Sequence, residues 1–214
     1  MTVSEDLAKE QIERFERSMT RSKWKLENQD LGEESVSRVH GSVGRKEENI
    51  GLYRLLLGDV SAATERLEEA ARRYALKYEH KQTYEAEEND QATWQTQRSI
   101  LERLTYAALL SRDDALVEET AAKVDELDAY RRQFPEMAHK YHYTTALARV
   151  AADADDQQEC VDAFSDSLAD VKPDHQPYFS SLSTILDGIV SGDEATVHDG
   201  LEAFLDDYDE DRND

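Results

Sequence analysis

Residues that break or cross-link a chain are scarce in this sequence. Its 214 residues include three prolines, eight glycines and one cysteine, Cys160. A single cysteine excludes an internal disulfide, and the shortage of helix breakers favours helix over sheet. Because Cys160 stands at an apolar position of an expected helix, we predict that it is a buried structural thiol.

Long apolar segments are also missing. No run approaches the roughly 18 apolar residues of a membrane-spanning helix. The first residues, MTVSEDLAKEQIERFERS, carry acidic side chains where a signal peptide would have an apolar core. These features predict a cytoplasmic protein without a membrane partner.

Positive charge is in short supply. The chain holds 48 Asp and Glu against 25 Lys and Arg, a net charge of −23, and its basic residues are nine Lys and 16 Arg. This composition favours a halophilic protein, because at molar salt the Debye length falls to about 3 Å and self-repulsion costs little. An ordinary acidic protein is the alternative.

The acidic excess is concentrated in the second half of the chain. Residues 1–107 hold 21 acidic and 17 basic side chains, whereas residues 108–214 hold 27 and eight. A surface with this charge repels nucleic acid and attracts basic proteins. We therefore expect a protein partner, with a basic toxin or nuclease as one candidate, and no nucleic-acid binding.

Hydrophobic periodicity predicts an all-α protein of about nine helices. We expect a first helix over residues 4–27, capped by Ser4, and then a glycine-containing loop over residues 28–44 with at most one short helix. Four helix pairs follow, each with an apolar helix, a short turn and a more charged helix. The turns lie at Gly58–Asp59, Arg112–Asp113, Asp155–Asp156 and Gly192–Asp193. In each turn Asp is expected to cap the next helix, and Asp156 and Glu159 fit a capping box.

The second helices share a register. Apolar residues recur four, eight, eleven or twelve and fifteen positions after each turn Asp, which places one stripe along a face of each helix. These residues are Ala63, Leu67, Ala70, Ala71 and Tyr74; Val117, Ala121 and Val124; Cys160, Phe164, Leu168 and Val171; and Val197, Leu201, Phe204, Leu205 and Tyr208. The preceding helices are more apolar, and we expect them to lie inside, covered by their charged partners.

The turns are 54, 43 and 37 residues apart, so the repeat is irregular. The predicted fold is an irregular α/α helical repeat, either a tetratricopeptide-like solenoid or a compact helical array. We expect a single domain over residues 1–208, with its first helix and loop in 1–44 and its helix pairs in 45–208. Residues 209–214 are expected to form a frayed acidic tail.

Three residues on one expected helix could suggest a metal site. Glu136 and His139 form half of a di-iron bundle motif, and His142 follows three residues later. No second motif of this kind occurs, and the three side chains would wrap through nearly 240° of helix. We find no phosphate-binding loop and no nucleophile elbow either. We therefore assign no catalytic, cofactor-binding or metal-binding residue, although a metal-dependent helical enzyme stays a less favoured alternative.

Basic and aromatic residues have structural interpretations. Residues 14–25 hold a basic patch, which we expect to pair with the acidic body of the same chain. Trp24 and Trp94 are predicted core anchors. Most of the clustered tyrosines are predicted core filler. They are Tyr74, Tyr78, Tyr84, Tyr106, Tyr130, Tyr141 and Tyr143.

Two segments resemble a known family. A helix led by Trp94 ends in a leucine run and an Arg-Asp turn, in the sequence LTYAALLSRDDALVEE. A later apolar helix ends in Gly-Asp and is followed by a charged helix, in the sequence LSTILDGIVSGDEATVHDGLEAFLDDY. Over roughly residues 90–210 the chain resembles the immunity protein 49 family. The resemblance implies tetratricopeptide-like helix pairs and a protein that neutralises a cognate toxin, often a nuclease, encoded beside it. It implies no catalytic residue.

These features together predict a non-catalytic protein-binding module, with an immunity or inhibitor protein as the first hypothesis. A general helical-repeat scaffold or regulator of a salt-adapted cytoplasm is the second. The number of partners bound would separate these two hypotheses. The sequence does not specify the oligomeric state.

The halophilic interpretation predicts that low salt weakens the fold. Lowering the salt from molar to about 0.1 M lengthens the Debye length from about 3 Å to about 10 Å, so repulsion between carboxylates grows. We expect the melting temperature, measured by circular dichroism, to fall across this range. An unchanged melting temperature would contradict the interpretation.

Overall fold

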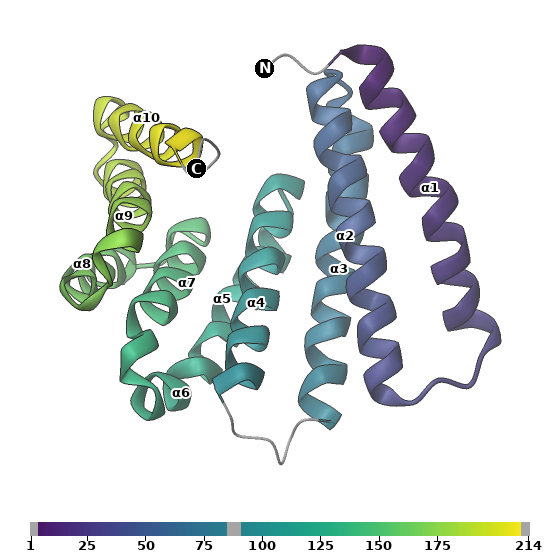
Figure 1. Cartoon of the computed structure of the whole chain (residues 1–214), viewed down its shortest axis with the longest axis horizontal. Coiled ribbons are helices and arrows are strands. Elements are labelled where there is room, and N and C mark those ends of the chain that lie inside the picture. The colour runs from purple at the N-terminus through teal and green to yellow at the C-terminus, as the bar shows by residue number, and fades with distance from the viewer. Residues whose placement is uncertain (1–3, 85–90, 211–214) are drawn as a thin grey trace. The chain divides into compact units, whose positions relative to one another are not determined.

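The computed structural model of the chain describes residues 4–84 and 91–210, and the elements that it describes are all helical (Figure 1). They are α1 (Glu5–Asn28), α2 (Glu33–Leu56), α3 (Val60–Tyr84), α4 (Gln91–Ser111), α5 (Asp114–Val124), η1 (Asp125–Leu127), α6 (Asp128–Gln133), η2 (Pro135–Met137), α7 (Ala138–Ala151), α8 (Gln157–Ser167), η3 (Leu168–Asp170), η4 (Pro173–His175), α9 (Gln176–Ser191) and α10 (Glu194–Glu210). The predicted all-α fold of about nine helices is confirmed. Nine of the described α-helices have more than ten residues, and the remaining one, α6, has only six.

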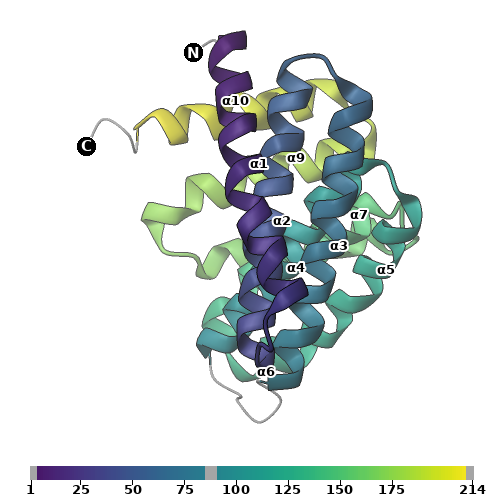
Figure 2. The same ribbon diagram turned by 90° about the vertical axis from the view of Figure 1, so that its right-hand side faces the viewer.

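The helices form two compact units, Met1–Thr120 and Ala121–Asp214, which we call unit 1 and unit 2. In unit 1, α1 packs on α2, α2 on α3 and α3 on α4, as long helices side by side (Figure 1). In unit 2, α7 packs on α8 and α9, and α10 packs on α9 in both views (Figures 1 and 2). The single domain and the helical repeat stay predictions.

The loop expected over residues 28–44 is wrong, because α2 begins at Glu33 and runs through its glycines. These glycines allow close packing of α2 on α3. A Cβ at Gly44 would lie 3.2 Å from the Cβ of Arg73, and one at Gly51 would lie 2.7 Å from Cγ of Leu67. Burial of this helix face outweighs the low intrinsic helix propensity of glycine, which costs about 1 kcal/mol per residue.

Helix capping follows the prediction at four of five sites. Ser4 Oγ accepts a hydrogen bond from the backbone N–H of Leu7 at 3.3 Å. Asp59, Asp113 and Asp193 likewise accept from backbone N–H groups at the starts of α3, α5 and α10. The capping box at Asp156 is wrong. Its side chain makes no capping bond, and a carboxylate oxygen instead lies 3.6 Å from Nε of Arg149.

Most of the aromatic residues predicted to be core filler or core anchors lie in the interior. Trp94 is fully buried, as predicted, and so are Tyr74 and Tyr78. Tyr141 and Tyr143 are buried as well and Tyr106 is partly buried, whereas the side chains of Tyr84, Tyr130 and Tyr208 lie outside the described set. Trp24 is 53% exposed, so its prediction as a core anchor is wrong. The inward face of α1 carries Ile12 and Met19, and position 24 points away from it at 100° per residue.

A buried carboxylate connects the first three helices. Glu47 of α2 is fully buried, and its two oxygens lie 2.8 Å from Nζ of Lys23 on α1 and 2.9 Å from Nη1 of Arg66 on α3. Arg66 also reaches Glu16 on α1 at 2.8 Å. The prediction that the basic patch of residues 14–25 pairs within the chain is confirmed at Lys23.

A second polar network extends this pattern to α4. The hydroxyl of Tyr74 on α3 donates to Glu48 on α2, and Nη1 of Arg103 on α4 lies 2.9 Å from the same carboxylate. Burial and the Glu48 carboxylate raise the pKa of Tyr74 above its usual value. Hydrogen bonds and ion pairs of these charged side chains therefore connect α1, α2, α3 and α4.

His40 lies in a buried cationic setting between α2 and α3. Its ring stacks on that of His80 with centroids 5.5 Å apart, and its Nδ1 lies 3.4 Å from Nη1 of Arg73. Burial, the charge of Arg73 and the neighbouring His80 lower the pKa of His40 to about 4, although Glu69 acts in the opposite direction. The neutral imidazole is therefore favoured in the folded protein.

Among the described helices, none combines the length and the apolar character needed to cross a membrane.

Removing the Glu47 charge should destabilise unit 1. In Glu47→Gln, Lys23 and Arg66 lose their shared partner. Their side chains are 35% and 32% exposed, so water recovers part of the lost interaction. We expect a loss of about 2 kcal/mol in the free energy of unfolding, measured by urea titration. Glu5→Gln, which breaks an exposed pair with Lys9, is the control and should leave the transition midpoint unchanged. Equal midpoints for the two variants would contradict this role.

Acid should destabilise the protein partly through His40. Its folded-state pKa lies below the unfolded value of 6.5, so the unfolded chain binds a proton first as the pH falls. The contribution of the neutral His40 ring to the free energy of unfolding is complete above pH 6.5 and is lost as the pH falls towards 4. About 2 kcal/mol of it is lost by pH 5. His40→Gln should flatten the dependence of unfolding free energy on pH between 6.5 and 5. An unaltered slope would show that His40 does not contribute.

Candidate functional site

The apolar stripes of the four second helices differ in how far they are covered. At the positions eight and twelve residues after the turn Asp, Leu67 and Ala71 of α3 are fully buried, and Phe164 and Leu168 of unit 2 are also buried. At the same two positions of α10, Leu201 and Leu205 are 47% and 59% exposed. The first and third stripes are thus buried at these two positions, whereas that of α10 remains partly at the surface.

Close packing on α9 orients α10. A Cβ at Gly188 would lie 2.7 Å from the backbone N of Val197, and one at Gly200 would lie 2.8 Å from Cγ1 of Ile185. The face of α10 that contains Val197 and Gly200 therefore lies against α9. Leu201 follows Gly200 by one residue, or about 100° of helix rotation, and this rotation turns it towards solvent.

The turn between α9 and α10 holds this packing in place. Gly192 has a φ of 69°, which ends α9 in the left-handed conformation that glycine adopts without strain. Asp193 then accepts hydrogen bonds from the backbone N–H of Ala195 and the hydroxyl of Thr196, at 3.0 and 2.9 Å. These hydrogen bonds lower the pKa of Asp193.

An exposed apolar side chain of α9 lies beside Val197 of α10. Ile189, next to the contact glycine Gly188, is 50% exposed and lines a pocket of about 320 Å³ together with Val197. Val197, Leu201 and Leu205 follow one another at intervals of four residues along α10. We call Ile189, Val197, Leu201 and Leu205 the α10 stripe.

Carboxylates flank the α10 stripe. The sequence of α10 contains seven Asp and Glu and no Lys or Arg, and residues 173–211 contain no Lys or Arg at all. No ion pair links Glu194, Asp199, Asp206 or Asp207 to another described residue. The surface thus combines apolar side chains with uncompensated negative charge.

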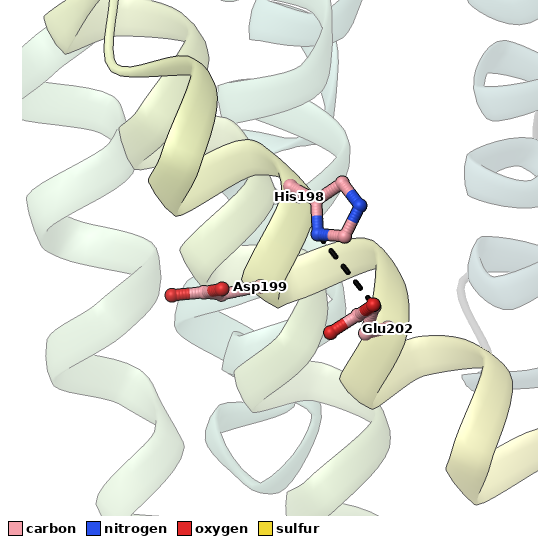
Figure 3. Close-up of side chains that lie close together, drawn as sticks. All are labelled: His198, Asp199 and Glu202. Carbon is pink, nitrogen blue, oxygen red and sulfur yellow. Dashed lines mark ion pairs between the residues drawn. The ribbon is translucent and has the colours of Figure 1, made fainter.

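One group on α10 has the side-chain types of a metal site. His198, Asp199 and Glu202 each offer a ligand atom within 4.8 Å of the others, and His198 Nδ1 lies 3.7 Å from Glu202 Oε1 (Figure 3). All three residues are exposed, and they come from a single turn of a strongly acidic helix. Their arrangement fits a solvated helix face, so we assign no metal to it.

The three possible metal ligands of the sequence analysis, Glu136, His139 and His142, line two different pockets of unit 2. Glu136 and His139 line a pocket of about 580 Å³ with Asp170 and His175. His142 instead lines a pocket of about 230 Å³ with Cys160. Because the residues separate in this way, the geometry provides no argument for a joint metal site. Cys160 is partly buried rather than buried as predicted, and burial raises the pKa of its thiol.

Sequence reasoning found the residues of the α10 stripe but not their exposure. The repeat register identified Val197, Leu201 and Leu205, and it treated them as equivalent to stripes that the structure buries. Exposure depends on which neighbouring element covers a face, and local periodicity does not carry that information.

Comparison of the chain with protein-family models, curated proteins and solved structures found no significant match. The resemblance to the immunity protein 49 family therefore stays a prediction.

Proposed function

We propose that this protein is a non-catalytic binding module that uses the α10 stripe to bind a basic partner protein. We further propose that it is an immunity or inhibitor protein whose partner is a toxin. The observation that carries the proposal is the exposure of Leu201 and Leu205 at register positions that are buried in α3 and in the segment of α8 and η3. The family resemblance, which includes α9 and α10, supports a toxin as the partner.

The α10 stripe suits an amphipathic partner helix. Such a helix would place apolar side chains four residues apart against Leu201 and Leu205, which have the same spacing. Its flanking Lys and Arg side chains would face carboxylates such as Glu202 and Asp206. A nuclease has basic surfaces for binding phosphate, so the same charge complementarity suits a nuclease toxin.

Apolar contact should provide most of the affinity. Complete burial of a leucine side chain is worth roughly 1.5–3 kcal/mol, and the two leucines are already about half covered. Each would thus contribute about 1 kcal/mol on binding. In molar salt the flanking charges are screened beyond about 3 Å, which reduces their contribution to affinity more than that of the leucines.

Affinity capture from the native cytoplasm at molar salt, followed by mass spectrometry, tests the proposal. We expect one dominant, stoichiometric partner with a basic domain, and binding should inhibit any toxic activity of that domain. Many weak partners would instead favour the scaffold hypothesis. A dominant partner without toxic activity would retain the binding module and reject the immunity role.

Leucine variants test the binding face directly. The double variant Leu201→Gln and Leu205→Gln should weaken binding to the purified partner at least about tenfold in titration calorimetry, because it removes both apolar anchors. Its melting temperature should stay close to that of the parent chain, since both positions are exposed. Leu56→Gln on α2 is the matched control, because Leu56 is 65% exposed but lies in unit 1. Equal affinities for both variants would exclude the α10 stripe as the interface.

A further inference from the structure

A basic groove lies between α1, α2 and α3 of unit 1, in a chain that is otherwise strongly acidic. The groove has a volume of about 400 Å³, and four cationic side chains line it: Arg38, Arg45 and Lys46 of α2 and Lys77 of α3. Phe15 of α1 forms an apolar part of its wall. The sequence does not reveal this site, because residues 28–44 were expected to form a loop.

The two lysines of the groove come from different helices, Lys46 from α2 and Lys77 from α3. The side chain of Lys77 passes over Gly41, where an added Cβ would lie 2.7 Å from its Cδ and 3.1 Å from its Nζ. Lys46 Nζ donates to the hydroxyls of Ser22 and Ser42, at 3.0 and 3.1 Å. Neutral hydroxyl groups, rather than carboxylates, thus contact the Lys46 ammonium group, and the absence of a side chain at Gly41 leaves room for that of Lys77.

Three of the four groove cations lack the acidic partners that neighbouring cations have. Arg38 pairs with Glu34, but Arg45, Lys46 and Lys77 form no ion pair with any residue in the described parts of the chain. Other cations of these helices do have carboxylate partners, as Lys23 and Arg66 have in Glu47. A chain with 48 acidic residues and 25 basic ones thus leaves three adjacent cations without a counter-charge.

The electrostatic setting of Lys77 is unfavourable to its own charge. Burial and the positive charges of Arg45, Lys81 and Arg103 lower its pKa. Burial also lowers the pKa of Lys46. An anion placed among these groups would remove the mutual repulsion and would accept hydrogen bonds from ammonium and guanidinium donors.

We propose that this groove binds a phosphate group, carried by a small phosphate ester or present as the free ion. A tetrahedral dianion matches the three uncompensated cations, because its oxygens accept hydrogen bonds from several directions at once. The groove has room beyond the phosphate itself, and Phe15 provides an apolar wall for the organic part of an ester. This site lies in unit 1 and does not depend on partner binding by unit 2.

Titration calorimetry with inorganic phosphate and with phenyl phosphate tests the site, at the lowest sodium chloride concentration at which circular dichroism shows an intact fold. We expect both probes to bind with one site per chain, and phenyl phosphate to bind more tightly because of Phe15. Equal affinity of the two probes would identify the free ion as the ligand. Absence of saturable binding for both probes at about 10 mM would overturn the proposal.

Charge variants separate this site from general attraction to basic residues. Lys77→Gln should weaken phosphate binding at least about tenfold, because it removes a charge-assisted hydrogen bond. It should not lower the melting temperature without phosphate, since it removes a repulsive charge. Arg45→Gln, at an exposed position, is a second test if Lys77→Gln does not fold. Arg72→Gln on α3 is the matched control, because Arg72 is exposed and pairs with Glu68. Equal losses in Arg72→Gln and Lys77→Gln would show non-specific binding and overturn the proposal.

Discussion

The arrangement of α1, α2 and α3 depends on the buried carboxylate of Glu47. A carboxylate in the interior is costly unless its charge is paired and its oxygens accept hydrogen bonds. Lys23 from α1 and Arg66 from α3 approach its two oxygens from opposite helices, so the three helices must keep one rotation and one register to satisfy it. A purely apolar contact would tolerate sliding, because hydrophobic burial has little directional preference.

Close packing of α2 on α3 accompanies this charge network. Gly44 and Gly51 remove side chains where α3 approaches, and so the ion pairs form at short distance while Leu67 and Tyr74 remain buried. The same packing has an electrostatic consequence beyond the core. It brings Arg45 and Lys46 of α2 and Lys77 of α3 together near Gly41, and these three cations form no ion pair with a carboxylate of the described residues.

Charge is distributed differently in the two units. In unit 1 acidic side chains at the helix interfaces pair with Lys or Arg, as Glu47 does with Lys23 and Arg66 and Glu48 does with Arg103. In unit 2 the last helix carries only negative charge beside its partly exposed leucines. Salt adaptation favours acidic side chains over the whole surface of a protein. A face that binds a basic partner instead combines acidic side chains with exposed apolar ones. The α10 stripe fulfils the second condition, and it is therefore the surface on which the proposed function rests.

Local sequence signals predicted much of the secondary structure. Ser4, Asp59, Asp113 and Asp193 marked helix starts because capping involves only neighbouring residues. The helix through residues 33–44 could not be predicted, since its glycines are favourable only where α3 packs on them. The α10 stripe was recognisable by its period of four residues, yet its exposure was not. The groove around Lys77 was likewise invisible, because it joins residues from three helices. Periodicity and capping depend on near neighbours, whereas burial, ion pairing and the shape of a binding surface depend on segments that are distant along the chain.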